Sequence, residues 1–82
     1  MNEIENCKRI IEIEIEKHGF TVCKIDAVPS TGGQIIARVT TTDGKTADGT
    51  QQMFVEAISR AAEDGVSLEE VLSYRNMYAP SI

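Results

Sequence analysis

The sequence predicts a single small α+β domain over residues 1–82, with the element order α-β-β-α-α. Three observations lead to this fold. Apolar residues at helical spacing cover more than half the circumference of residues 53–62, and two β-branched segments flank a Gly-Gly turn between residues 20 and 42. Residues 67–70 form an S-x-x-E box of the kind that opens helices. We therefore expect a two-stranded antiparallel hairpin with helices packed on one face.

Residues 2–18 are predicted to form the first helix. Asn2 can cap it with Glu5 three residues later, and Gly19 stands where a C-terminal glycine belongs. The alternative is a third strand at residues 10–16, where isoleucine alternates with glutamate, in a three-stranded antiparallel meander followed by two helices. The helix is preferred because it explains the whole segment. Its apolar stripe would consist of Ile4, Cys7, Ile11, Ile15 and His18.

Residues 20–28 and 34–42 are predicted to be the strands of the hairpin, joined by a loop at 29–33. Because alternate residues of a strand face opposite sides, one face of the hairpin should be buried and the other largely wet. The residues predicted to face the core are Cys23, Ile25, Ala27, Ile35, Ala37, Val39 and Thr41.

Two Asp-Gly pairs indicate that residues 43–50 form a loop. Asp48 or Thr50 can cap the central helix, and Gly65 can end it. The apolar arc of that helix is wider than on an ordinary surface helix, so we expect neighbours to cover it on more than one side. A last helix follows, and Pro80 would end it.

Acidic residues outnumber basic ones by 13 to 8, which gives a formal charge of −5 and an isoelectric point near 4.7. Binding to DNA or to an anionic membrane needs a basic face, so neither is expected as a partner. No apolar run approaches the ~20 residues of a membrane span, and the N-terminus lacks the pattern of a signal peptide. The sequence therefore predicts a cytoplasmic protein in which Cys7 and Cys23 are reduced, buried thiols.

No catalytic residue, metal ligand or cofactor site is predicted. His18 is the only histidine, and a Cys–His nucleophile would lack a third group to orient it. Two cysteines and one histidine are too few for a structural zinc site. The abundant carboxylates lie on predicted helix surfaces, where such groups are usually solvated. We therefore do not expect an enzyme.

Residues 58–76 resemble part of a DNA-binding helix-turn-helix, with Ala61, Gly65 and Val71 at the alanine, turn-glycine and valine positions of that motif. The resemblance implies a small transcriptional regulator, which is the alternative function. Two of the three residues that would enter the major groove are glutamates, however, and phosphates repel them. The three residues are Leu68, Glu69 and Glu70.

Two surface features are the candidate binding sites. One is an acidic surface suited to a basic partner, and the other is a C-terminal segment rich in the side chains enriched at interfaces. The acidic residues are Glu5, Glu12, Glu16, Glu63, Asp64, Glu69 and Glu70. The interface candidates are Tyr74, Arg75, Met77 and Tyr78, of which the two tyrosines alternatively form a lid on the core.

The function expected from these features is that of a non-enzymatic adaptor or inhibitor. Its acidic surface would dock on a basic protein face, such as that of a nucleic-acid-binding protein or complex. A mobile-element inhibitor of a nucleic-acid machine, of the anti-CRISPR kind, would have these properties. A self-associating homo-oligomer is a further alternative, because the exposed edges of a two-stranded sheet can pair with another chain.

Overall fold

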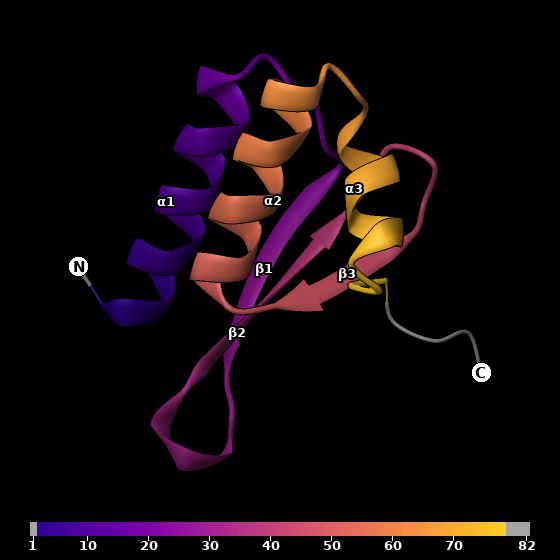
Figure 1. Cartoon of the computed structure of the whole chain (residues 1–82). Coiled ribbons are helices and arrows are strands. Elements are labelled where there is room, and N and C mark those ends of the chain that lie inside the picture. Colours follow the sequence, from indigo (N-terminus) through magenta and orange to yellow (C-terminus); the bar gives the residue numbers. More distant parts are fainter. Residues whose placement is uncertain (1, 79–82) are drawn as a thin grey trace.

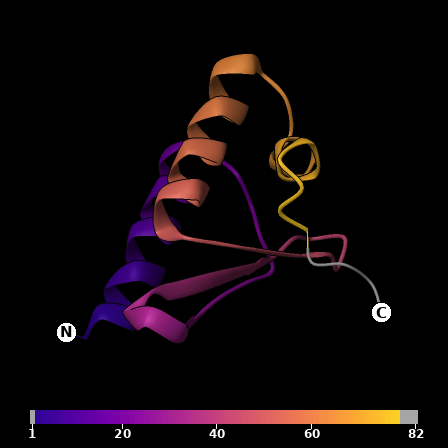
Figure 2. The same cartoon turned by 60° about the horizontal axis from the view of Figure 1, so that its bottom comes forward.

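The computed structural model describes residues 2–78. Within this range a three-stranded antiparallel sheet of order β1-β2-β3 carries three helices on one face (Figures 1 and 2). The predicted α+β class is therefore confirmed. The elements in chain order are α1 (Glu3–Lys17), β1 (Lys24–Pro29), a short 3-10 turn (Thr31–Gly33), β2 (Ile35–Thr40), β3 (Thr46–Gly49), α2 (Gln51–Asp64) and α3 (Leu68–Tyr74).

The prediction of only two strands is wrong. β3 occupies Thr46–Gly49, within the segment expected to be a loop, and pairs antiparallel with β2. Gly44, with a φ of 88°, forms the tight turn between these strands. The alternative, a three-stranded antiparallel meander followed by two helices, matches the observed sheet and the helices after it, but it places the third strand at residues 10–16, which belong to α1.

The small residues of β3 explain why its sequence does not look like a strand. Ala47 is fully buried in the core. A Cβ atom on Gly49 would lie 2.9 Å from Cε at the flexible end of the Met77 side chain, so a larger residue there would require Met77 to shift. Two of the four residues of β3 are thus small and of low strand propensity, and propensity alone does not identify this strand.

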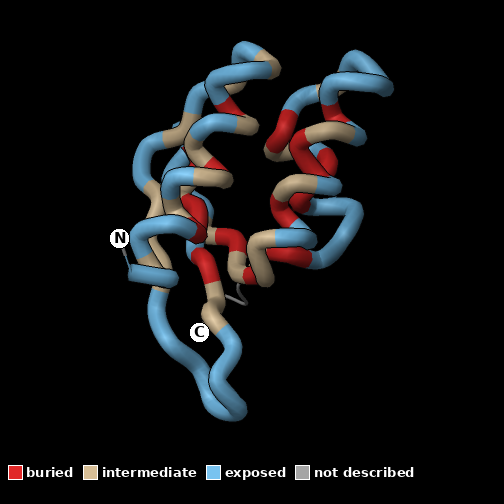
Figure 3. The backbone as a smooth tube through the Cα atoms, turned by 90° about the vertical axis from the view of Figure 1, so that its left-hand side faces the viewer, coloured by how far each residue is buried: buried red, intermediate tan, exposed pale blue. Residues whose placement is uncertain are grey.

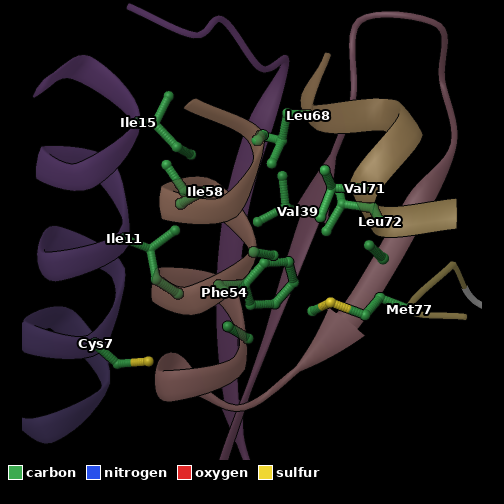
Figure 4. Packing of buried hydrophobic residues seen from close by; sticks show 14 residues of the cluster. Cys7, Ile11, Ile15, Val39, Phe54, Ile58, Leu68, Val71, Leu72 and Met77 are labelled. Atoms are coloured by element: carbon green, nitrogen blue, oxygen red, sulfur yellow. The ribbon is translucent and has the colours of Figure 1, made fainter. Parts of the chain in front are cut away.

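The central helix, α2, lies between α1 and α3 and also contacts β2 (Figure 1). Phe54 and Ile58 of α2 belong to one buried cluster with Ile11 of α1 and Leu72 of α3 (Figure 4). Buried residues gather on the inner sides of the elements, whereas the loop between β1 and β2 is exposed (Figure 3). The predicted covering of this helix on more than one side is confirmed, although Met53 at the margin of its apolar arc is 40% exposed.

The predicted ends of α1 and α2 are also confirmed. The Asn2 side chain accepts a hydrogen bond from the Glu5 backbone N–H at 2.8 Å. Thr50 caps α2 in the same way by accepting from the Met53 N–H. Gly65 ends α2 with a φ of 67°, in the left-handed region that favours glycine.

The last helix starts at its predicted cap but ends at Tyr74, earlier than expected. Asn76 then adopts a left-handed φ of 55°, which turns the chain away from the helix axis. The next residue, Met77, accepts a hydrogen bond from the Asp48 N–H of β3 at 2.8 Å. Pairing with β3 thus replaces further helical turns, and Pro80 lies outside the described residues.

The predicted inward face of the hairpin is confirmed except at Cys23. Alternate residues from Ala37 to Thr41 are fully buried, and their partners on β1 are half-buried. Cys23 is exposed. It lies outside the strand, because β1 begins only at Lys24. Cys7 is buried, as predicted.

Candidate interaction surfaces

The helical layer carries the net negative charge of the protein. Residues 18–50, which contain the sheet, include three acidic and three basic residues, so all of the excess acid lies in residues 3–17 and 51–78. The helices cover a single face of the sheet (Figure 2). The molecule therefore has an acidic helical side and a sheet side whose charges balance.

Four of the seven predicted acidic residues lie around the turn between α2 and α3 (Figure 1). Glu63 and Asp64 end α2, and Glu69 and Glu70 lie in the first turn of α3. We name these four residues the acidic corner. Within residues 2–78 none of them forms an ion pair within 4.0 Å, so their charges are available to an external cation.

The two halves of the acidic corner affect their helices in opposite ways. Carboxylates in the first turn of a helix stabilise it by about 0.3–1 kcal/mol each, and Glu69 and Glu70 occupy such positions. Glu63 and Asp64 lie at the negative end of α2, where a carboxylate costs a similar free energy. Helix stability therefore does not explain the acids that end α2.

The other three predicted acids, Glu5, Glu12 and Glu16, lie on α1. They line one groove together with Lys8 and Arg9. The Arg9 Nη1 forms an exposed ion pair with the Glu12 Oε1 at 3.0 Å, so the acids on this side of the helix lie beside basic groups. The seven acidic residues thus fall into two groups, one on α1 and one at the corner.

The groove beside α1 has a volume of about 640 Å³ and is lined by both apolar and charged residues. We name it the α1–β1 groove, because it runs between α1 and the chain that enters β1. The sequence pattern does not reveal it, since residues 20–28 read as one strand, whereas β1 starts only at Lys24. The apolar residues that line the groove are Ile15, Phe20, Val22 and Ile25.

A row of charged side chains crosses the sheet on the face away from the helices. Asp26, Arg38 and Asp48 are register partners on β1, β2 and β3. Arg38 Nε and Nη2 donate to the two carboxylate oxygens of Asp48 at 2.6 and 2.8 Å. These hydrogen bonds lower the pKa of the Asp48 carboxyl and raise the pKa of the Arg38 guanidinium. The sequence does not predict this row, because Asp48 lies in a segment expected to be a loop.

The four predicted interface residues near the C-terminus have different environments. Tyr74 is 78% exposed. The Arg75 Nη1 lies 3.7 Å from the Glu56 Oε2 of α2. Met77 is only 3% exposed and belongs to the core, so a partner cannot reach it without opening the fold. Tyr78 is half-buried.

Tyr78 closes the edge of the sheet at β3. Its backbone forms a bridge with Ala47, and the Lys45 Nζ lies 5.4 Å from the centroid of its ring. The hydroxyl is buried and makes no hydrogen bond of good geometry within residues 2–78. Burial raises the pKa of the phenol, and the neighbouring Thr41 hydroxyl acts in the opposite direction. Of the two tyrosines, Tyr78 covers the core and Tyr74 points to solvent.

The residues considered for chemistry do not form a cluster in the described structure. The His18 Nε2 lies 3.4 Å from the Glu14 Oε2, one helical turn away. Over residues 2–78 no group of three or more His, Cys, Asp or Glu side chains is arranged to hold a metal ion. No helix in that same range is long and apolar enough to cross a membrane.

The segment that resembles a helix-turn-helix consists of the second half of α2, the turn at Gly65, and α3. Leu68, which would have to enter a DNA groove, is 2% exposed and packs in the core. Glu69 and Glu70 lie beside it on the surface side of a helix of only seven residues.

Comparison with family models, with curated protein sequences and with solved structures gives no significant match for this chain.

Proposed function

We propose that this protein is a non-enzymatic interaction module, an adaptor or inhibitor, that docks its acidic helical side on a basic protein surface. The acidic corner is the observation that carries the proposal. Its four carboxylates have no ion-pair partner within residues 2–78, and two of them lie where they oppose the α2 dipole. Charges of opposite sign across an interface steer the encounter and fix the orientation of the partners.

An exposed aromatic side chain adds a contact of a second kind. Tyr74 lines a shallow hollow together with Lys45, Glu69 and Glu70. Exposed tyrosines that become buried when a partner binds are frequent anchors of binding free energy. A partner with an arginine-rich face would contact the carboxylates and the ring at the same time.

The class of partner follows from the sign and density of the charge. Proteins that bind nucleic acid have dense cationic surfaces, and an acidic protein can compete for such a surface. A mobile-element inhibitor of a nucleic-acid machine, of the anti-CRISPR kind, is one form that this function would take.

A small DNA-binding regulator is the alternative, supported by the resemblance of residues 58–76 to a helix-turn-helix. The burial of Leu68 and the two carboxylates beside it weigh against this alternative. If it holds, the protein retards a DNA duplex at physiological salt, and a change at Ser67 abolishes the shift whereas a change at Glu12 does not.

The experiment begins with capture of partners from the native cell on immobilised protein, followed by titration of the purified partner. We expect the affinity to fall steeply as salt rises, because exposed charges are screened over ~8–10 Å. The variant Glu63→Gln/Glu70→Gln should bind about tenfold or more weakly at low salt, which corresponds to about 1.4 kcal/mol.

The matched control is Glu3→Gln/Glu14→Gln, which changes the net charge by the same amount on α1. A specific corner predicts that this control binds nearly as well as the natural chain. Equal losses in both variants would mean that only the net charge matters, and a salt-independent affinity would refute the proposal.

A further inference from the structure

The two outer edges of the sheet differ in their backbone pairing. At β3, the Asp48 N–H donates to the Met77 carbonyl, and Ala47 forms a bridge with Tyr78. At β1, no segment within residues 2–78 pairs along the outer edge of Lys24–Pro29. This free edge presents backbone N–H and C=O groups to solvent, which is the arrangement that accepts a further strand.

The charges of β1 are complementary to themselves. Lys24 and Asp26 lie on the same face of the strand, and the Lys24 Nζ is 3.4 Å from the Asp26 Oδ2. If two β1 strands pair antiparallel with Ile25 opposite Ile25 of a second copy, each Lys24 stands opposite an Asp26. Shifting the register by two residues would place Asp26 opposite itself, which repels. The charges therefore favour this register over those shifted by two residues.

The side of α1 that lines the α1–β1 groove carries charges of both signs. Along this side the order is Glu5, Lys8, Arg9, Glu12 and Glu16. A twofold axis through the β1 pair places a second α1 antiparallel to the first, so that this mixed-charge side of one copy faces the same side of the other. One symmetry operation thus brings together both the strands and the helices of the two copies.

The spacing of the layers permits this arrangement. α1 contacts both β1 and β2, and neighbouring strands are about 4.8 Å apart. A helix centred between these two strands would lie about 10 Å from its symmetry mate, close to the ~8–10 Å between packed helices. The second copy would then cover the half-buried side chains of Phe20 and Val22 in the groove.

We propose that two copies of this chain pair antiparallel through their β1 edges, with Ile25 opposite Ile25, to form one continuous six-stranded sheet. The interface consists of residues 24–26 of the two β1 strands, with residues 27–29 of each copy opposite residues 21–23 of the other, together with two Lys24–Asp26 pairs and the facing sides of the two α1 helices. It leaves the acidic corner of each copy free, so the dimer would present two such corners.

The direct test is the mass of the natural chain in sedimentation equilibrium. We expect it to rise from one copy toward two between about 10 µM and about 1 mM, where a weak interface of small area would show. A mass that stays at one copy up to the highest concentration would overturn the proposal and leave the edge to a different partner.

Two charge reversals identify the interface. Lys24→Glu and Asp26→Lys should each weaken self-association at least about tenfold, because each places like charges opposite each other. An equimolar mixture of the two should restore the dimer, because every position 24 then faces an opposite charge at position 26. The matched controls are Arg60→Glu and Glu56→Lys, which make the same charge changes on α2 and should leave the dimer intact.

Circular dichroism of each variant establishes that it is folded before its mass is interpreted. A dimer that survives Lys24→Glu unchanged would refute the β1 interface even though the protein associates. Weakening by both reversals without recovery in the mixture would also refute the stated register. Recovery only in the mixture supports it, since neither loss of fold nor net charge produces that result.

Discussion

The two edges of the sheet are constructed in opposite ways. At β3, the segment after α3 pairs with the strand backbone, and the side chain of Met77 is buried beneath it. At β1, the outer edge is unpaired within residues 2–78. Half-buried Phe20 and Val22 line an open groove beside this strand.

This difference suggests that the β3 edge contributes to the stability of the fold and the β1 edge to contacts with other molecules. An exposed edge invites pairing with other chains, so proteins cover it, shorten it or place charges and proline on it. This chain covers the β3 edge with its own C-terminal segment, whereas within residues 2–78 the β1 edge is left open, and its Lys24 and Asp26 restrict which strand can pair with it. We therefore expect substitutions at the β3 edge to affect unfolding, and substitutions at the β1 edge to affect contacts with other molecules.

The largest expected effect is in the reactivity of the two cysteines. Cys23 is exposed beside the open edge, whereas Cys7 is 3% exposed and its burial raises the pKa of its thiol. The thiolate is the reactive form, and Cys7 becomes accessible only when α1 opens. We expect Cys7 to react with an aromatic disulfide reagent about 1,000-fold more slowly than Cys23, which corresponds to an opening free energy of ~4 kcal/mol.

The measurement uses two single-thiol proteins, Cys23→Ala to follow Cys7 and Cys7→Ala to follow Cys23. In urea the two rates should become similar, because the burial of Cys7 is then lost. Similar rates in the native protein would show that α1 detaches readily and that the reagent reaches the core beneath it.

The next effect compares one side chain at each edge. Met77→Ala should reduce the free energy of unfolding by about 2–4 kcal/mol, because it removes a buried side chain and leaves a cavity beneath the β3 edge. Val28→Ala on β1 is the control, since Val28 is 57% exposed, and it should change stability by less than about 0.5 kcal/mol. Urea unfolding followed by circular dichroism measures both.

An equal loss in these two variants would contradict the assignment of a closed and an open edge. A small loss for Met77→Ala alone would mean that the C-terminal segment detaches readily from β3. Both edges would then be open to other chains.

The sequence predicts the three helices and the caps of α1 and α2. Helix ends follow from local rules, so the cap at Asn2 and the left-handed glycine at Gly65 are predictable from a few neighbouring residues. The isoleucine–glutamate alternation at residues 10–16 favours a strand locally, but capping and the apolar stripe of the whole segment favour the observed helix. Rules that act within one or two turns are thus sufficient for α1 and α2.

The features that escaped prediction depend on contacts between distant residues. β3 is a strand because β2 and Met77 flank it, and its small residues fit that space and have little strand propensity. α3 ends early for the same reason, since its continuation pairs with β3. Of the candidate sites, the acids of the corner could be read from the sequence, but the α1–β1 groove and the row through Arg38 required the third strand and its register.

The smallest expected effect concerns the ion pair that joins β3 to β2 on the face of the sheet away from the helices. Arg38 and Asp48 are bidentate partners, but their side chains are 53% and 35% exposed. Asp48→Asn should therefore cost only about 0.5–1 kcal/mol at pH 7. Arg38 lowers the pKa of Asp48 in the folded state below its ordinary value of 3.8, so the pair stabilises the fold above pH ~4 and this contribution is lost as pH falls through the lowered pKa. Urea unfolding of the natural chain and of Asp48→Asn should give a constant difference from pH 7 to pH 5 that shrinks below about pH 4. A difference that persists in full at the lowest pH would assign the loss to packing of the side chain, and the charge pair would then contribute nothing to holding the closed edge.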